Sequence, residues 1–349
     1  GIERRCLVSE IIGIHEIAQI AGVTPAAVTN WKSRYKDTFP APVADVKAGS
    51  FYDREQIESW LRKRGKLVGA KVISFINLKG GVAKTTTTVG TATVLAGEFG
   101  KKVLVVDLDP QTNCTTMLIG DDKWQELNEQ GYTLATLFKD SINETHNFNL
   151  EKTLQKGVSG IRDVITLDLI PSSLDMIDIQ DNLATVPRGQ FFSNNPTEII
   201  KRAIKPIMGD YDYILIDCPP NMGLITLNGL RISDGYIIPT IPDVLSTYGI
   251  PQIINRVDRF AESISEDIVC LGIVATKVRG QSSLHDRTLK QLQSNKDAEV
   301  FKTVFYENNQ IGEAAECQPI NTLRQKWGYQ GQFERFSSFV TEIMDKMEG

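Results

Sequence analysis

Residues 71–86 read KVISFINLKGGVAKTT, and this stretch decides the fold. Its first seven residues form an apolar run whose length and composition are typical of a buried β-strand. The small residues that follow let successive backbone N–H groups point inward at a phosphate. Lys84 then supplies a cation for the terminal phosphates, and the Thr85 hydroxyl supplies a magnesium ligand. The stretch therefore predicts a strand, a phosphate-binding loop and a helix in series.

The loop departs from the general P-loop pattern in three ways. Ala83 stands directly before the lysine, and Leu78 stands five residues earlier, where the pattern has glycine. Alanine is the mildest replacement, and we expect it to restrict the backbone. The extra Lys79 makes the sequence the deviant form KGGxxK[ST][ST]. The predicted nucleotide contacts in the loop are Lys79, Gly80, Gly81, Val82, Ala83, Lys84, Thr85 and Thr86.

Two further apolar runs end in acidic residues. Residues 103–106 (VLVV) lead into DLDPQTN at 107–113, after a predicted helix at 84–98, and residues 213–216 (YILI) lead into DCPPN at 217–221. The carboxyl ends of parallel strands converge where such sheets bind nucleotides. Asp217 is therefore expected to hold magnesium through water or through the Thr85 hydroxyl. Apolar runs at 236–240 and 270–276 predict two later core strands.

Taken in this order, KGGVAKTT, DLDPQ and DCPPN resemble the ParA/MinD family of deviant Walker A ATPases, over roughly residues 70–345. The resemblance implies an α/β P-loop NTPase with a mostly parallel twisted sheet flanked by helices, which binds ATP and Mg²⁺. It implies that Lys79 reaches across a homodimer to the partner's nucleotide, that Asp109 orients the attacking water and that Asp107 lies near the hydrated magnesium. The implied catalytic residues are Lys79, Lys84 and Asp109, the metal site is Thr85, Asp107 and Asp217, and further nucleotide contacts are Thr276 and Lys277.

The N-terminal part of the chain differs in charge from the remainder. Residues 1–67 carry a net charge of +3, whereas the whole chain carries -5, so a small basic module precedes an acidic body. Such an asymmetry suggests that the module meets a polyanion. We therefore predict a winged helix-turn-helix DNA-binding domain at 1–67, a linker at 64–70 and the ATPase domain at 68–349.

The helix-turn-helix prediction depends on residues 14–31, which read IHEIAQIAGVTPAAVTNW. Gly22 suits a left-handed turn, Thr24 suits the cap of a second helix, and Pro25 suits the first position of that helix. The buried side would hold Ile17, Ala18, Ala21, Val23, Val28 and Trp31. The side that faces a DNA groove would hold Ala26, Thr29, Asn30, Lys32 and Ser33.

Residues 40–42 and 47–52 predict a hairpin wing after these helices. Asp53 is then expected to cap a helix, with Gln56 in a capping-box arrangement. That helix would bury Ile57, Trp60 and Leu61 and expose Arg62, Lys63 and Arg64. The whole resembles a winged helix-turn-helix of the excisionase-like or MerR-like kind. The alternative is a small helical dimerisation domain that never touches DNA.

The resemblance to larger plasmid-partition ParA proteins implies a function for the whole chain. The ATP dimer would bind DNA without sequence preference, and a ParB-like adaptor would trigger hydrolysis, so that plasmid or chromosomal DNA is segregated. Site-specific binding by the N-terminal domain could also repress the protein's own operon. Nonspecific binding needs several cations on one surface. The candidates are Arg256, Arg259, Lys277, Arg279, Arg287 and Lys290.

Two other functions stay open, namely a nucleotide-responsive transcriptional repressor and a ParA-like ATPase that positions a non-DNA cargo such as a microcompartment. The sequence has no run of about 20 apolar residues, so we expect a cytoplasmic, nucleoid-associated protein. MinD-like membrane binding is disfavoured by Glu342, Asp345 and Glu348 at the C-terminus. The cysteines are scattered and suit reduced thiols better than disulfides, a zinc site or an iron–sulfur cluster; they are Cys6, Cys114, Cys218, Cys270 and Cys317.

Overall fold

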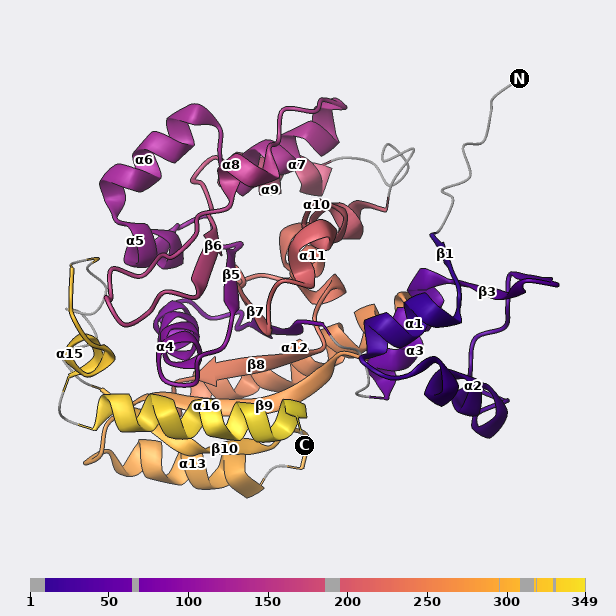
Figure 1. Cartoon of the computed structure of the whole chain (residues 1–349). Helices are drawn as coiled ribbons and strands as arrows, with labels where there is room; N and C mark the ends of the chain where they lie inside the picture. Colours follow the sequence, from indigo (N-terminus) through magenta and orange to yellow (C-terminus); the bar gives the residue numbers. More distant parts are fainter. Residues whose placement is uncertain are drawn as a thin grey trace. The chain divides into compact units, whose positions relative to one another are not determined.

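The computed structural model describes residues 10–64, 69–185, 195–294, 296–307, 317, 319–328 and 331–348 (Figure 1). The chain divides into two compact units, Gly1–Gly69 and Ala70–Gly349, and each is described by itself. The division falls in the predicted linker at 64–70. Most of that linker lies outside the described residues, and so does Cys6.

The first unit packs helices against a small antiparallel sheet whose strand order is β1-β3-β2. Its core is aromatic: the Trp60 ring lies 5.8 Å from Trp31 and 4.9 Å from Phe39, centroid to centroid. Tyr52 is fully buried beside Phe39. The elements are β1 (Ile11–Ile12), α1 (Ile14–Ala21), α2 (Pro25–Arg34), β2 (Ala44–Val46), β3 (Gly49–Asp53) and α3 (Arg54–Lys63).

The two predicted helices and their turn lie where the local signals put them. Gly22 adopts a left-handed conformation with φ 62°, and Pro25 is the first residue of α2. The Thr24 hydroxyl accepts a hydrogen bond from the Ala27 N–H at 3.3 Å, so it caps α2. Of the residues predicted to be buried, Val23 is only partly buried, and the remaining five are buried: Ile17, Ala18, Ala21, Val28 and Trp31.

The wing and the third helix differ from the prediction in detail. The hairpin pairs β2 with β3, so its first strand follows the prolines at 40–42 rather than containing them. Asp53 caps α3 through the Gln56 N–H at 3.0 Å, and Ile57, Trp60 and Leu61 are buried as predicted. Arg64 was expected in solvent, but its guanidinium stacks 3.7 Å from the centroid of a tyrosine ring and donates to a threonine hydroxyl. The side chains of Arg62 and Lys63 lie outside the described residues.

The second unit is a seven-stranded, entirely parallel sheet with the order β10-β9-β8-β4-β7-β5-β6. Its strands are β4 (Lys71–Phe75), β5 (Val103–Asp107), β6 (Leu167–Ile170), β7 (Tyr213–Asp217), β8 (Gly235–Thr240), β9 (Val269–Val278) and β10 (Val300–Tyr306). The helices are α4 (Lys84–Gly97), α5 (Asn113–Ile119), α6 (Asp121–Gln130), α7 (Leu134–Asn143), α8 (Leu150–Thr153), α9 (Met176–Thr185), η1 (Pro196–Glu198), α10 (Ile199–Met208), α11 (Leu224–Arg231), α12 (Val244–Ser263), α13 (Ser283–Ser294), α15 (Leu323–Trp327) and α16 (Gln332–Glu348).

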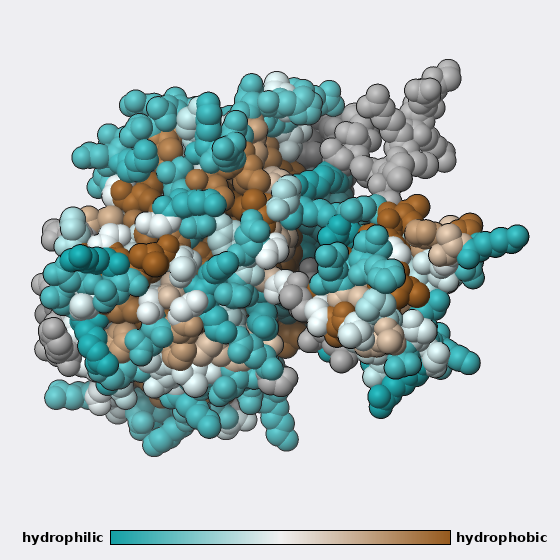
Figure 2. Space-filling model, in the orientation of Figure 1, coloured by the Kyte–Doolittle hydropathy of each residue, from teal (hydrophilic) through white to brown (hydrophobic). Residues whose placement is uncertain are grey.

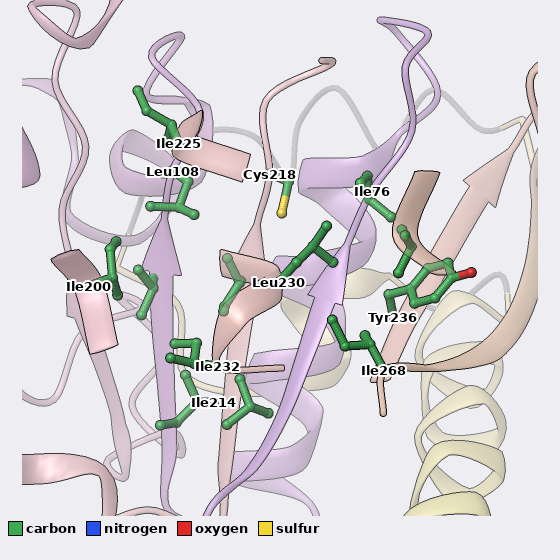
Figure 3. Close-up of a cluster of buried hydrophobic side chains, with 14 of the residues drawn as sticks. Ile76, Leu108, Ile200, Ile214, Cys218, Ile225, Leu230, Ile232, Tyr236 and Ile268 are labelled. Atoms are coloured by element: carbon green, nitrogen blue, oxygen red, sulfur yellow. The ribbon is translucent and has the colours of Figure 1, made fainter. Parts of the chain in front are cut away.

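Helices cover both faces of this sheet, because alternate strand residues point to opposite sides. Val72, Ile214 and the other strand residues that point to this face pack against α7, α10, α11 and α12. Figure 3 shows part of this cluster. Ile73 and Leu215 face the other way, toward α4 and α16. The α4–α16 contact is close: a Cβ added at Gly90 would lie 2.2 Å from the Phe336 ring. This confirms the predicted α/β fold with a parallel sheet between helical layers.

Two strands of the seven-stranded sheet were not predicted. β6 has four residues, and β10 is an edge strand of alternating character, VFKTVFY, whose buried residues meet α16. The C-terminal helix α16 buries an apolar stripe against the sheet: Phe336, Phe339 and Ile343 are buried, and Met344 is partly buried. Figure 2 shows a largely hydrophilic surface over α6 and α13. None of the described helices is long and apolar enough to cross a membrane.

Candidate nucleotide-binding site

A buried lysine and two carboxylates form the floor of the site, at the carboxyl ends of β4, β5 and β7. Lys84 begins α4, and its Nζ lies 2.6 Å from Asp217 Oδ1 and 3.5 Å from Asp109 Oδ2. Burial alone would lower the pKa of Lys84, but the charges of the two aspartates outweigh it and raise that pKa. The ammonium is therefore charged and held in place before any ligand arrives.

The metal-binding prediction for Thr85 and Asp217 fits this geometry. The Thr85 hydroxyl donates to Asp217 Oδ2 at 2.7 Å, so the two oxygens lie together beside Lys84. Within the described residues, His, Cys, Asp and Glu side chains do not gather in threes, as a metal site built only of protein ligands would require. Mg²⁺ commonly takes only one or two protein oxygens and completes its shell with water and phosphate. The pair is therefore suited to a nucleotide-bound Mg²⁺ and less suited to a cage made only of protein ligands.

Asp107 is engaged elsewhere. It is fully buried, one oxygen accepts from the Asp109 N–H at 3.0 Å, and the other accepts from both the N–H and the hydroxyl of Thr115. Burial and the neighbouring Asp217 raise the pKa of Asp107. The carboxylate thus orders the DLDPQ segment and the first turn of α5. Its predicted contact with hydrated magnesium stays a prediction that this placement does not favour.

Asp109 faces the cavity on a fixed backbone. Its carbonyl oxygen accepts from the Ser172 hydroxyl at 2.7 Å, and its Oδ1 accepts from the Gln111 N–H at 3.0 Å. The other carboxylate oxygen points toward Lys84. A carboxylate so held has the geometry to orient a water beside a phosphate, and this role stays a prediction.

Lys79 lies at the rim. Its N–H donates to Asn77 Oδ1 at 3.0 Å, and Asn77 in turn donates to the Pro239 carbonyl, so the backbone is anchored. The ammonium lies 3.0 Å from Asp243 Oδ2, with the two side chains 40% and 27% exposed. Asp243 was not among the predicted site residues. Its position just after β8, at the same sheet edge as the loop, was the one available signal.

Thr276 and Lys277 contact the loop itself. The buried Thr276 hydroxyl donates to the Val82 carbonyl at 2.9 Å, and Lys277 Nζ donates to the Gly81 carbonyl at 2.8 Å. Ala83 adopts a left-handed conformation, φ 58° and ψ 27°, which alanine rarely accepts. The loop is therefore braced from β9, and the predicted restriction at Ala83 corresponds to a strained backbone.

These residues enclose a cavity of about 650 Å³, within the usual range for ligand sites. It is lined by all eight loop residues predicted as nucleotide contacts, together with Asp109 and Lys277. Four further lining residues were not among the predicted site residues: Gln111, Asn113, Pro220 and Glu307. The first three lie in the DLDPQTN and DCPPN segments after β5 and β7, whereas Glu307 follows β10 and reaches the loop only through the sheet order.

The predicted DNA-contacting cations of this unit do not form one free cluster. Arg279 pairs with Glu307 at 2.7 Å, Lys290 pairs with Asp286 at 3.1 Å, and Arg287 donates to a backbone carbonyl. Arg256 and Arg259 are exposed on α12. Arg279, Lys290 and Arg287 are thus engaged within their own chain, whereas Arg256 and Arg259 present exposed side chains.

In the first unit, the side of α2 predicted to face DNA is exposed at Ala26, Thr29, Asn30 and Ser33. Lys32 differs, because it is partly buried and its ammonium donates to the Ser50 hydroxyl in β3 at 3.2 Å. Lys32 therefore ties α2 to the wing, which the sequence analysis did not foresee.

Comparison with known proteins agrees with this site. Residues 70–270 match the AAA domain family. The chain is 31% identical over 246 residues to the sporulation initiation inhibitor protein Soj of Bacillus subtilis, covering 70% of this chain and 87% of Soj. It is 28% identical over 244 residues to the chromosome partitioning protein ParA of Caulobacter vibrioides, covering 70% of this chain and 83% of that protein. Cobyrinic acid a,c-diamide synthase from Mycobacterium smegmatis, solved with an ATP analogue and magnesium, aligns with a TM-score of 0.56 at 26% identity, covering 70% of this chain and 91% of that one.

The parallel sheet, the phosphate-binding loop and these matches define a P-loop ATPase fold. The chain belongs to the AAA domain family, and its similarity to Soj and ParA confirms the resemblance to the ParA/MinD family.

Proposed function

We propose that this chain binds ATP with Mg²⁺, dimerises around it, and uses slow hydrolysis to segregate plasmid or chromosomal DNA on the nucleoid. Membership of the Soj and ParA family supports the general activity of a partition-type ATPase. The homodimer, the DNA and a ParB-like adaptor that triggers hydrolysis are the finer parts of the proposal. The residue roles and the two-domain division at 67/68 also belong to it.

The observation that carries the proposal is the position of Lys79. Its backbone is fixed by Asn77, while its ammonium lies at the mouth of the cavity on a partly exposed carboxylate. Lys84, in contrast, already supplies a cation at the floor. A second cation at the rim suits a phosphate that approaches from outside the protomer, as a facing copy would present it.

The described residues divide the work of hydrolysis. Lys84 and the loop N–H groups bind and orient the phosphates, and Asp109 holds a water. Bound Mg²⁺ supplies charge stabilisation on the phosphate oxygens, and Thr85 and Asp217 would hold it. Lys79 from a second copy adds charge stabilisation, so the complete site exists only in the dimer.

DNA binding is proposed for both units. Thr29 and Asn30, which are exposed on α2, would contact bases, and Arg256 and Arg259, which are exposed on α12, would contact phosphates without regard to sequence. Lys32 is a weaker candidate, because it is bound to Ser50.

The exposed face of α2 also favours a second candidate, a nucleotide-responsive repressor. Footprinting on the protein's own promoter region, with and without ATP, distinguishes the two functions. A repressor protects one operator, and the Asp109→Ala substitution leaves its repression unchanged. A partition ATPase with that substitution loses segregation of its plasmid or chromosome.

Light scattering of the wild type and Lys84→Ala, with Mg²⁺ and either ADP or a nonhydrolysable ATP analogue, tests the proposal. We expect the wild-type mass to double only with the analogue, because only a triphosphate reaches the partner's lysine. Lys84→Ala should stay monomeric, since its phosphates lack their principal cation. A wild-type mass that does not respond to nucleotide would contradict the proposal.

A further inference from the structure

The cavity has two ends with different chemistry. Toward β5 it is lined by Asp109 and Gln111, near the buried lysine and the Thr85–Asp217 pair. Toward β9 and β10 it is lined by Lys277 and Glu307. The sheet order places β9 and β10 on the opposite side of β4 from β5. A triphosphate seated on the loop with its terminal phosphate near Asp109 therefore directs its nucleoside toward Glu307.

Glu307 is held at that end by hydrogen bonds to two neighbours, Val278 and Arg279. Its N–H donates to the Val278 carbonyl at 3.0 Å, which fixes its backbone against β9. Arg279 Nε donates to Glu307 Oε2 at 2.7 Å. The Lys277 ammonium, bonded to the Gly81 carbonyl, braces the loop next to it. The Glu307 side chain is nevertheless 50% exposed, so a ligand can reach its carboxylate.

The carboxylate can only accept hydrogen bonds. The hydrogen bond from Arg279 lowers the pKa of Glu307, which keeps it ionised at neutral pH. An ionised carboxylate accepts and never donates. It is thus complementary to an exocyclic amino group, and it repels a carbonyl oxygen placed at the same point.

We propose that Glu307 accepts a hydrogen bond from the 6-amino group of adenine and so sets the base preference of the site. The proposal rests on the ATP binding proposed above and adds the residue that reads the base. In the same pose, the 6-oxo oxygen of guanine would meet a carboxylate oxygen of Glu307, and the two acceptors would repel each other. Arg279 acts as a positioning residue that holds the carboxylate.

The test compares ATP with purine riboside triphosphate, which carries hydrogen in place of the 6-amino group. Affinities are measured with Mg²⁺ by competition against a fluorescent ATP analogue. For the wild type we expect about tenfold tighter binding of ATP, the size of one hydrogen bond to a charged group on a half-exposed side chain. For Glu307→Ala we expect the two affinities to be equal, with purine riboside triphosphate bound as tightly as by the wild type.

Two control variants accompany the comparison. Glu334→Ala removes an exposed glutamate that lies outside this cavity and pairs with Arg324, and it should keep the tenfold preference. Arg279→Ala leaves the acceptor in place and should keep most of the preference. An unchanged ratio in Glu307→Ala, or a ratio lost only in Arg279→Ala, would overturn the assignment. If the wild type bound neither nucleotide, the proposed ATP binding itself would be wrong.

Discussion

The floor and the rim of the cavity each contain a P-loop lysine paired with a carboxylate, but the two pairs differ in burial. Lys84 is 7% exposed and its partner Asp217 is fully buried, whereas the Lys79–Asp243 pair is 40% and 27% exposed. Breaking a buried pair leaves an uncompensated charge and costs several kcal/mol. An exposed pair contributes about 1 kcal/mol or less. The buried Lys84–Asp217 pair is therefore costly to break. Lys79 at the rim can exchange Asp243 for another anion at little cost.

The largest effect is expected at the floor, where Asp109→Ala removes the group that orients water. Hydrolysis should fall about 10² to 10⁴-fold, the usual contribution of a positioned general base. ATP binding should be retained, because Lys84 keeps Asp217 as its partner. Single-turnover hydrolysis and equilibrium binding measure the two quantities separately.

Asp175→Ala serves as the matched control for Asp109→Ala, because this aspartate is exposed and pairs with Lys139 away from the cavity. It should change neither quantity. Equal hydrolysis by Asp109→Ala and the wild type would remove Asp109 from the mechanism.

A smaller effect is expected at the rim, where Asp243→Asn removes the charge that holds Lys79 in its own protomer. We expect ATP-dependent dimerisation to tighten by up to about fivefold, because an exposed pair is worth at most about 1 kcal/mol. Sedimentation with a nonhydrolysable analogue gives the dimer dissociation constant.

Asp286→Asn is the control for the rim, since it breaks the exposed pair with Lys290 on α13 and leaves the cavity intact. Its dimer constant should equal that of the wild type. Weaker dimerisation of Asp243→Asn would mean that this carboxylate supports the dimer instead of competing with it.

The smallest effect is expected between floor and rim, at the strained Ala83. Ala83→Gly should raise the free energy of unfolding by about 0.5 kcal/mol, because glycine accepts the left-handed conformation and offsets part of this gain by its greater unfolded-state entropy. Urea unfolding measures it. Ala92→Gly, at a buried position in α4, should instead lower stability by about 1 kcal/mol or more. Destabilisation of both variants would show that Ala83 is not strained.

Local sequence patterns were sufficient for the parts of the site that follow directly from one strand. The loop, Asp109 and Asp217 each sit at the end of an apolar run, so their convergence could be predicted once the strands were assumed parallel. Asp243 and Glu307 could not be found this way, because only the observed strand order brings them to the loop.

The fold was predictable to a similar depth. The helices of the first unit follow from Gly22, Thr24 and Asp53, whose turn and capping preferences are local. The positions of Lys32 and Arg64 depend on tertiary contacts with Ser50 and with aromatic rings, which no local pattern records. The edge strand β10 was missed because its alternation of apolar and polar residues is short.

Mixing two inactive variants tests most directly whether the rim lysine acts on the partner's nucleotide. Lys79→Ala and Asp109→Ala are each expected to hydrolyse ATP poorly. In a mixed dimer, the Lys79→Ala protomer keeps its Asp109 and receives Lys79 from the Asp109→Ala protomer. One of the two sites in that dimer is therefore complete. An equimolar mixture should therefore recover about a quarter of wild-type activity if the subunits pair at random. Activity no greater than the average of the two separate variants would mean that Lys79 serves its own protomer, and the account would fail.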